Sequence, residues 1–127
     1  MPTEAEWEYA CRSGGKEETC SGGSNVDGVG WYGDNSNSQT HPAGTKGANG
    51  LGIHDMSGNV REWVQDIHAP YPVAAQTDPV VESGGAGRVR RGGSWNDDAR
   101  YLRCVNRFFN DPAYRISIMG FRLARTP

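Results

Sequence analysis

The segment from residue 14 to residue 50 consists mainly of Gly, Ser, Asn and Asp, and its few apolar residues follow neither a helical nor a strand period. Residues of these kinds favour turns and irregular backbone. A loop of this length is uncommon in a compact domain unless it is functional or is held by an ion. The segment therefore predicts a loop-rich fold, in which Trp31 and Tyr32 are the expected aromatic anchors.

The composition agrees with a single loop-rich domain. The 127 residues include 18 Gly and 7 Pro, and 35% of them are hydrophobic. We therefore expect one domain over residues 1–127 with a core of moderate size. The net charge of −2 and the pI near 5.9 give no electrostatic reason to expect a nucleic-acid partner. No apolar run approaches the ~20 residues of a membrane span, and residues 1–4 lack the features of a signal peptide, so the compartment stays undetermined.

A short helix is predicted at the start of the chain. Thr3 followed by Glu6 matches a capping box, and Trp7 and Cys11 would lie on one face before the glycines at 14 and 15 end the helix. Residues 51–64 form a second ordered block, residues 70–87 a further loop, and residues 88–90 a short strand. Long helices are not expected.

The three cysteines have irregular spacing that matches neither a disulfide framework nor a zinc site. Cys11 and Cys104 stand in apolar surroundings and are predicted to be buried thiols. Cys20 lies among Gly and Ser and is predicted to be the exposed one.

The histidines and a cluster of arginines are two further candidates for a binding site, and neither is favoured. The histidines at 41, 54 and 68 match no metal-ligand pair and are predicted to be surface or hydrogen-bonding residues. Arg88, Arg90 and Arg91 could bind phosphate, but the aspartates at 97, 98 and 111 are close in sequence, so internal ion pairs are expected.

Two carboxylates, Asp55 and Glu62, flank a Gly58-Asn59 turn. Such a turn directs several carbonyl groups to one side, and calcium accepts six to eight oxygen ligands with loose geometry. The alternative is that the carboxylates cap the turn and pair with Arg61.

The last third of the chain contains small and charged residues that are predicted to form a framework. Between them lie large apolar residues in a context rich in Asn and Asp. Aromatic residues interleaved with short polar ones are typical of binding loops. The alternative is that about half of these side chains pack beneath long loops.

Several ordered blocks resemble the formylglycine-generating enzyme (sulfatase-modifying factor) family. They are PTEAEWEYA at residues 2–10, NGLG at 49–52, DMSGNV at 55–60, EW at 62–63, RGGSW at 91–95 and GFR at 120–122. The resemblance implies an α+β, C-type-lectin-like fold with short helices, small antiparallel sheets and much loop. It also implies that calcium would be held at Asp55, Gly58, Val60 and Glu62.

The sequence departs from the family pattern in two places. The oxidising members bind copper(I) through a pair of cysteines soon after the Gly-Gly-Ser block, whereas residues 96–103 here contain no cysteine. Copper chemistry is therefore not expected. The family's N-terminal strands also have no counterpart before Met1, so an N-terminally truncated form is expected, and its unpaired sheet edge predicts a homo-oligomer.

A narrower resemblance concerns the C-terminal third, which is similar to the variable region of proteins diversified by retroelements. That system mutates adenines, so AAC codons become codons that end in C, and the variable-looking residues here are all encodable in this way. The resemblance implies a non-catalytic module that displays a variable surface to a protein or other macromolecular ligand.

The expected ligand-binding residues are Trp95, Asn96, Asp97, Asp98, Tyr101, Phe108, Phe109, Asn110, Tyr114, Ile116, Ser117 and Ile118. No catalytic residue is expected. The alternatives are a fragment or relative of a sulfatase-modifying oxidase and a structural or regulatory appendage of a larger protein.

Overall fold

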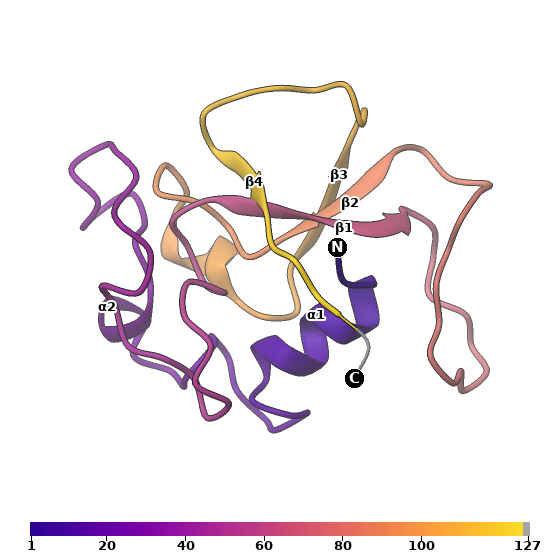
Figure 1. Ribbon diagram of the computed structural model, residues 1–127, viewed down its shortest axis with the longest axis horizontal. Helices are drawn as coiled ribbons and strands as arrows, with labels where there is room; N and C mark the ends of the chain where they lie inside the picture. Colours follow the sequence, from indigo (N-terminus) through magenta and orange to yellow (C-terminus); the bar gives the residue numbers. More distant parts are fainter. Residues whose placement is uncertain (126–127) are drawn as a thin grey trace.

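The computed structural model describes residues 1–125 (Figure 1). The elements are α1 (Glu4–Cys11), α2 (Val26–Val29), β1 (Arg61–Ile67), β2 (Arg88–Arg91), the 3-10 helix η1 (Ala99–Leu102), β3 (Arg107–Asn110) and β4 (Met119–Phe121). The strands form one sheet in the order β3-β2-β1-β4. β2 pairs antiparallel with β1 and β3, whereas β4 runs parallel to β1. The sheet is therefore mixed, which corrects the expectation of antiparallel pairing only.

Helix α1 confirms the capping-box prediction. The Thr3 hydroxyl accepts a hydrogen bond from the Glu6 amide at 3.2 Å, and the Glu6 carboxylate accepts one from the Thr3 amide at 2.8 Å. The helix lies across one face of the sheet (Figure 1). Its Trp7 and Cys11 are buried against that face. After the helix, Gly14 and Gly15 adopt φ of 86° and 84°, a conformation that favours glycine.

Two clusters of buried side chains make up the core. The first lies between α1 and the sheet and contains Trp7, Cys11, Met56, Val64, Val89 and Cys104. The second lies beneath α2 and η1 and contains Cys20, Val29, Tyr32 and Leu102. The glycine-rich loop therefore has its own apolar support, as the anchoring role predicted for Tyr32 requires.

A disulfide joins Cys11 and Cys104, and the prediction of two buried thiols is wrong. The end of α1 meets the segment before β3 there, which places the two Cα atoms 5.8 Å apart, within the range of a disulfide. The prediction that Cys20 is exposed is also wrong, because Cys20 packs in the second cluster and is 3% exposed. Burial raises the pKa of the Cys20 thiol.

Asn49 ties the long loop to α1. Its side-chain amide donates to the carbonyl of Ala10 at 2.7 Å and to the Ser21 hydroxyl at 3.0 Å, and its side-chain oxygen accepts from the amides of Leu51 and Ile53. Because residues from three separate segments meet at this one buried side chain, the loop is held without regular secondary structure.

The strand register assigns side chains to two faces of the sheet. Glu62, Arg91 and Arg107 are paired across β1, β2 and β3, and they point toward α1. We call this the inner face. The next row of partners is Trp63, Arg90, Phe108 and Phe121, which by strand alternation lies on the other side of the sheet. We call it the outer face, and the loop of residues 111–118 arches above it in Figure 1.

Candidate functional site

The ring of Phe108 is at the centre of the outer face. Two guanidinium groups lie near it, with Arg90 Cζ 5.4 Å and Arg61 Cζ 5.8 Å from the ring centroid. The ring of Tyr101, from η1, meets Phe108 edge to face at a centroid distance of 5.7 Å. Phe108 and Tyr101 are both partly buried, so they form a rigid aromatic platform rather than two free side chains.

Asp97 fixes one of these guanidinium groups. Both oxygens of its carboxylate accept hydrogen bonds from Arg61, one of them at 2.8 Å, and the Ser94 hydroxyl donates to Oδ2 at 2.7 Å. Asp97 is only 8% exposed. This predicted ligand-binding residue is therefore placed beneath the surface, where it neutralises and orients Arg61.

Arg90 differs from Arg61 because its side chain has no hydrogen-bond acceptor among residues 1–125. Its Nε atom is shielded from solvent and has no partner. Burial lowers the pKa of Arg90, and the positive charge of Arg61 lowers it further, whereas Asp97 and Tyr114 act in the opposite direction. The outer face thus carries one cation that the domain does not neutralise.

The loop between β3 and β4 adds exposed apolar side chains above this face. Tyr114 and Ile116 are each 43% exposed, and Ser117 is also exposed. The Asp111 side chain accepts a hydrogen bond from the Ala113 amide at 2.8 Å and so shapes the start of the loop. These residues are exposed, and their role as contacts stays a prediction.

The remaining predicted contact residues do not all share one surface. Asn96 and Asp98 are exposed near η1, and Asp98 caps that helix by accepting from the Arg100 amide. Phe109 points to the opposite side of β3 from Phe108 and stacks on His68 at a centroid distance of 4.2 Å. The others, Trp95, Asn110 and Ile118, are partly buried.

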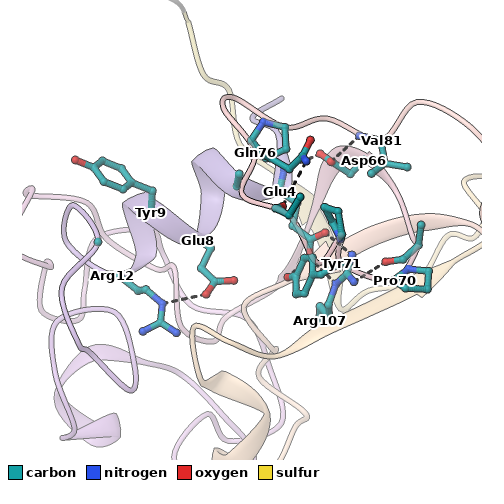
Figure 2. Close-up of a pocket in the computed structure, with 16 residues that line it drawn as sticks. Glu4, Glu8, Tyr9, Arg12, Asp66, Pro70, Tyr71, Gln76, Val81 and Arg107 are labelled. Atoms are coloured by element: carbon teal, nitrogen blue, oxygen red, sulfur yellow. Dashed lines mark hydrogen bonds and ion pairs between the residues drawn. The ribbon is translucent and has the colours of Figure 1, made fainter.

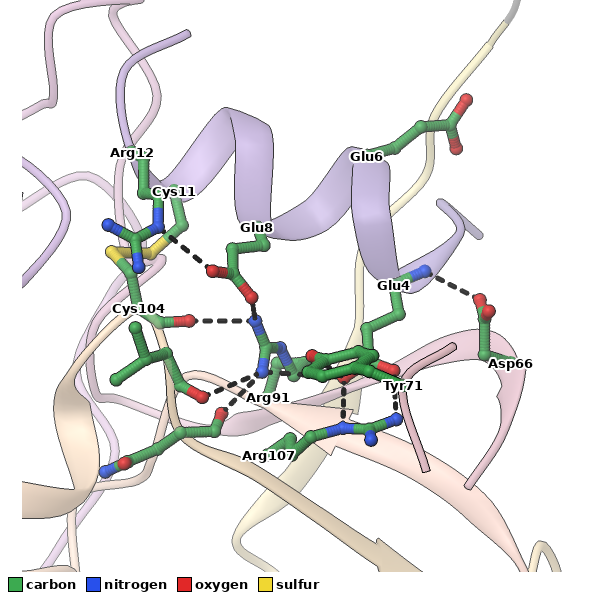
Figure 3. A network of polar contacts seen from close by, with 12 residues as sticks. Glu4, Glu6, Glu8, Cys11, Arg12, Asp66, Tyr71, Arg91, Cys104 and Arg107 are labelled. Atoms are coloured by element: carbon green, nitrogen blue, oxygen red, sulfur yellow. Dashed lines mark hydrogen bonds and ion pairs between the residues drawn. A yellow bond between two sulfur atoms is a disulfide. The ribbon is translucent and has the colours of Figure 1, made fainter. Parts of the chain in front are cut away.

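A network of ion pairs connects α1 to the inner face (Figure 3). The Arg91 side chain has no exposed surface and contacts the carboxylates of Glu4 and Glu8, and it donates to the Cys104 carbonyl at 2.8 Å. Arg107 donates to both oxygens of Glu4, at 2.8 and 2.5 Å. The predicted pairing of the arginine cluster at 88–91 with nearby aspartates is therefore wrong, because the sheet directs Arg91 across to α1.

A cavity of about 530 Å³ lies between α1 and the proline-rich segment 69–81 (Figure 2). Tyr71 covers part of it, with its ring 4.1 Å from Arg107 Cζ. The charged groups along its wall are already committed to one another: Glu4 is paired with Arg107, and Asp66 accepts from the amides of Glu4 and Val81. The cavity therefore presents mainly apolar walls.

The turn proposed to bind calcium borders another hollow, of about 480 Å³, lined in part by Asp55, Val60, Glu62 and Arg122. Asp55 adopts a φ of 58°, and its buried Oδ1 has no hydrogen-bond partner, which suits an oxygen ligand. Glu62, however, already accepts from Trp7 Nε1 and twice from Arg122, each at 2.7 Å. The donor set fits calcium at Asp55, whereas at Glu62 the ion would have to replace Arg122.

The histidine prediction is confirmed for two residues. His41 Nε2 is 2.7 Å from the Ser36 carbonyl, and His54 Nδ1 is 2.8 Å from the Lys46 carbonyl. Over residues 1–125, no group of three or more His, Cys, Asp and Glu side chains is arranged to hold a metal ion. A site of two carboxylates and two carbonyls would not be such a group. In the same part of the chain, no helix has the length and apolar character needed to cross a membrane.

The chain matches a family described as the sulfatase-modifying factor enzyme 1-like domain over residues 1–127. The chain belongs to this family. Among curated members and relatives, the formylglycine-generating enzyme of Mus musculus is 33% identical over 98% of this chain and 38% of its own length. Chaperone protein LppX of Paenibacillus barcinonensis is 40% identical over 75% of this chain and 38% of its own length. The chain thus spans well under half of each of these relatives.

Solved structures agree with the family assignment. Treponema denticola variable protein 1 superposes with a TM-score of 0.87 at 39% identity, over 95% of this chain and 45% of that one. PvdO from Pseudomonas aeruginosa superposes with a TM-score of 0.78 at 27% identity, over 95% of this chain and 50% of that one. The α+β, C-type-lectin-like fold of the sulfatase-modifying factor family is therefore confirmed, as is the resemblance to a variable protein.

Sequence reasoning missed the contribution of β1 and β2 to the outer face. Arg61, Trp63 and Arg90 lie there beside Phe108, although they are distant from it in sequence. The alternation of charged and apolar residues in Arg88-Val89-Arg90 was the available signal, because in a strand it puts Val89 inside and Arg90 outside. The pairing of the strands could not be derived from that alternation alone.

Proposed function

We propose that this domain is a non-catalytic binding module whose ligand contacts the outer face and the loop of residues 111–118. The observation that supports this most is the aromatic platform of Tyr101 and Phe108, next to a loop that exposes the side chains of Tyr114 and Ile116. Aromatic side chains supply a large contact area at low entropic cost, and the neighbouring Asn, Asp and Ser residues supply adaptable hydrogen bonds. Such a surface suits a macromolecular ligand.

Two further observations support binding rather than oxidation. The structural likeness to Treponema denticola variable protein 1 extends over 95% of this chain. The segment between Trp95 and Cys104 contains no thiol, and Cys104 itself is committed to a disulfide with Cys11. The cysteine pair that copper(I) would require is therefore not offered by this segment.

We also infer that the contact residues vary among related copies. The positions on the exposed loop can change without disturbing buried neighbours, which is the condition that a diversified surface requires. The sequence of the flanking DNA tests this inference: a reverse transcriptase and an adenine-containing template copy are expected, and a neighbourhood without both contradicts diversification by a retroelement.

The binding function is tested by selecting ligands from a random peptide library and measuring their affinity for variants. The double variant Tyr114→Ser/Ile116→Ser is expected to lose binding by tenfold or more, while its stability changes by less than ~0.5 kcal/mol because both side chains are exposed. The matched control is Tyr9→Ser/Leu51→Ser, which removes one exposed aromatic and one exposed aliphatic side chain at 61% and 51% exposure, away from the outer face.

Three results would contradict the proposal. They are the failure to select any peptide, equal binding by the two double variants, and thiol-dependent oxygen consumption by the copper-supplemented protein. The last result would favour the oxidase alternative.

A further inference from the structure

Arg90 stands apart from the other shielded arginines of residues 1–125. Each of the others donates to at least one carboxylate or carbonyl; these are Arg12, Arg61, Arg88, Arg91, Arg107 and Arg122. Arg90 donates to none, although its Nε atom is out of contact with solvent. A shielded guanidinium N–H group without an acceptor, here Nε–H, is costly, because its solvation is reduced and no hydrogen bond replaces it.

The residues paired directly with Arg90 do not supply the missing acceptor, and the shielded Oδ1 of Asn110, on the same side of β3 as Phe108, also has no hydrogen-bond partner. The partners of Arg90 across the sheet are Trp63 on β1 and Phe108 on β3, and both are aromatic. The nearby carboxylate of Asp97 is bound by both Arg61 and Ser94. The contact with the Phe108 ring at 5.4 Å offsets part of the charge but leaves the N–H groups of the guanidinium without an acceptor.

We propose that the outer face binds an acidic segment of another protein, in which an Asp or Glu carboxylate pairs with Arg90. Two parallel N–H···O bonds join a guanidinium and a carboxylate in the strongest arrangement of this kind. The flanking rings of Trp63 and Phe108 would lower the dielectric constant around the ion pair. They would also pack against apolar side chains of the bound segment, next to its acidic residue. This inference rests on the proposed binding function of the same face.

The charge of the face favours a carboxylate over a phosphate group or nucleic acid. Arg61 is neutralised by Asp97, so one uncompensated positive charge remains beside Phe108. A single charge matches a carboxylate, whereas a phosphate monoester carries close to two negative charges at neutral pH. Nucleic acid requires several cations along its backbone, and the domain as a whole has a net charge of −2.

The test begins with a random peptide library without phosphorylated residues, selected against the wild-type domain. Selected peptides are expected to be enriched in Asp or Glu next to apolar residues. Replacing that acidic residue by its amide should weaken binding ~30-fold, the usual effect of removing one partner from a shielded charge pair. Arg90→Gln should weaken binding of the acidic peptide by a similar factor.

A double-mutant cycle identifies the pair. If Arg90 receives the carboxylate, the amide peptide and the acidic peptide bind Arg90→Gln equally, because both changes remove the same interaction. Arg90→Lys keeps the charge but not the forked geometry and should give an intermediate affinity. The matched control is Arg103→Gln, which removes the same charge from an exposed side chain outside the outer face and should bind the acidic peptide as the wild type does.

Misfolding is separated from lost binding by two measurements. The melting temperature of Arg90→Gln should not fall clearly below that of the wild type, because Arg90 donates no hydrogen bond within residues 1–125 and the change removes a shielded charge. In the wild-type protein, the NMR signal of the Arg90 Nε–H group should shift when the acidic peptide is added and stay in place with the amide peptide.

The carboxylate inference is overturned if the selected peptides lack acidic residues, if the two changes of the cycle are additive, or if Arg103→Gln matches Arg90→Gln. Tenfold tighter binding of a phosphoserine peptide than of its Glu counterpart would assign the site to phosphate instead. If no peptide is selected, or if Tyr114→Ser/Ile116→Ser binds the peptides normally, the proposed function itself fails.

Discussion

Tyr32 is the residue that most directly links local chemistry to the stability of the long loop. Its ring is buried in the second core cluster, and its hydroxyl donates to the Asp27 carboxylate at 2.7 Å. That hydrogen bond, together with burial and the charges of Asp27 and Asp34, raises the pKa of Tyr32 to about 12. The neutral phenol is thus the form that the folded loop requires.

This environment predicts a loss of stability at alkaline pH. In the unfolded chain a tyrosine titrates near pH ~10, so the folded state holds the proton more tightly. The stabilisation is complete below pH 10 and is lost as the pH rises through the folded value of about 12. Urea unfolding of the wild type and of Asp27→Asn across this range measures it.

The Asp27→Asn variant is expected to lose less stability over that range, because its Tyr32 should titrate closer to the ordinary value. An ultraviolet titration should show that Tyr32 ionises at a lower pH in the variant than in the wild type. Equal pH profiles of the two proteins would contradict the role given to this hydrogen bond.

At this scale the sequence predicts residues whose partners are near in the chain. Thr3 and Glu6 are three positions apart, and their mutual capping follows from that spacing. Arg91 could not be assigned in this way, since its partners Glu4 and Glu8 lie more than eighty positions away, and the nearby aspartates were the wrong choice. The missing acceptor of Arg90 is equally a property of the assembled sheet.

The disulfide connects helix α1 to the segment before β3. The bonded cysteines are 93 positions apart in sequence, so the crosslink closes most of the chain into a loop and restricts the unfolded state. Changing Cys11 and Cys104 to Ala together is expected to lower the free energy of unfolding by about 2–5 kcal/mol. Denaturant unfolding with and without reductant measures the effect.

The control for this prediction is Cys20→Ser, which keeps the disulfide and should therefore retain the response to reductant. In denaturant without reductant, the wild-type chain should show one reactive thiol, that of Cys20. Three reactive thiols would mean that the crosslink does not form.

The turn between Asp55 and Glu62 carries the calcium prediction. A metal that binds only the folded state stabilises it by an amount set by its concentration, about 2.7 kcal/mol at 100 times the dissociation constant. The melting temperature should then rise with calcium and fall with a chelator, and Asp55→Asn should remove the response. Asp34→Asn, at an exposed position, should keep it.

Arg122 offers a second measurement of the same site. Because it already occupies both oxygens of Glu62, Arg122→Gln is expected to strengthen calcium binding. If calcium leaves the melting temperature of all these proteins unchanged, Asp55 only caps the turn and Glu62 only forms an ion pair.

Helices and strands could be predicted from the sequence where short-range patterns mark them. Helix α1 and strand β2 were expected close to their observed bounds, because capping and alternation are local patterns. The parallel placement of β4 beside β1 has no such signal, since a three-residue strand shows no period and its partner lies more than fifty residues earlier. The disulfide was missed for the same reason.

The whole molecule presents an open sheet edge. Within residues 1–125, β4 is the outermost strand and pairs only with β1, and the adjacent side chains of Phe121 and Leu123 are 64% and 82% exposed. An exposed edge with apolar side chains is a template for pairing with another chain. We therefore expect the domain in isolation to form a dimer or a higher oligomer.

The oligomeric state is measured by light scattering at a protein concentration of tens of micromolar. Leu123→Lys is expected to shift the population toward monomer, because a charged side chain on an edge strand opposes pairing. Val73→Lys is the control, since Val73 is also fully exposed but lies in the loop between β1 and β2. A folded wild-type monomer would rule out edge-mediated assembly.

At the scale of the whole fold, the motifs predicted the architecture correctly, because they mark the turns and buried corners on which the fold is built. The surface was harder to predict, since exposed and buried aromatic residues look alike in a loop-rich sequence. Phe108 and Phe109 are adjacent in the chain and nevertheless lie on opposite sides of β3. Their separation follows from the alternation of side chains along a strand, but which of the two faces outward follows from strand pairing, which a single sequence does not specify.

The alternation along β3 has a consequence for how this domain tolerates change. Arg107 is committed to Glu4 on α1, whereas its neighbour Phe108 faces outward beside Arg90. Consecutive codons of one short strand are therefore subject to unrelated constraints, one from folding and the next from recognition. A mutational scan should show tolerance that alternates from one position to the next, and a binding library built on this scaffold would randomise every second residue of the strand.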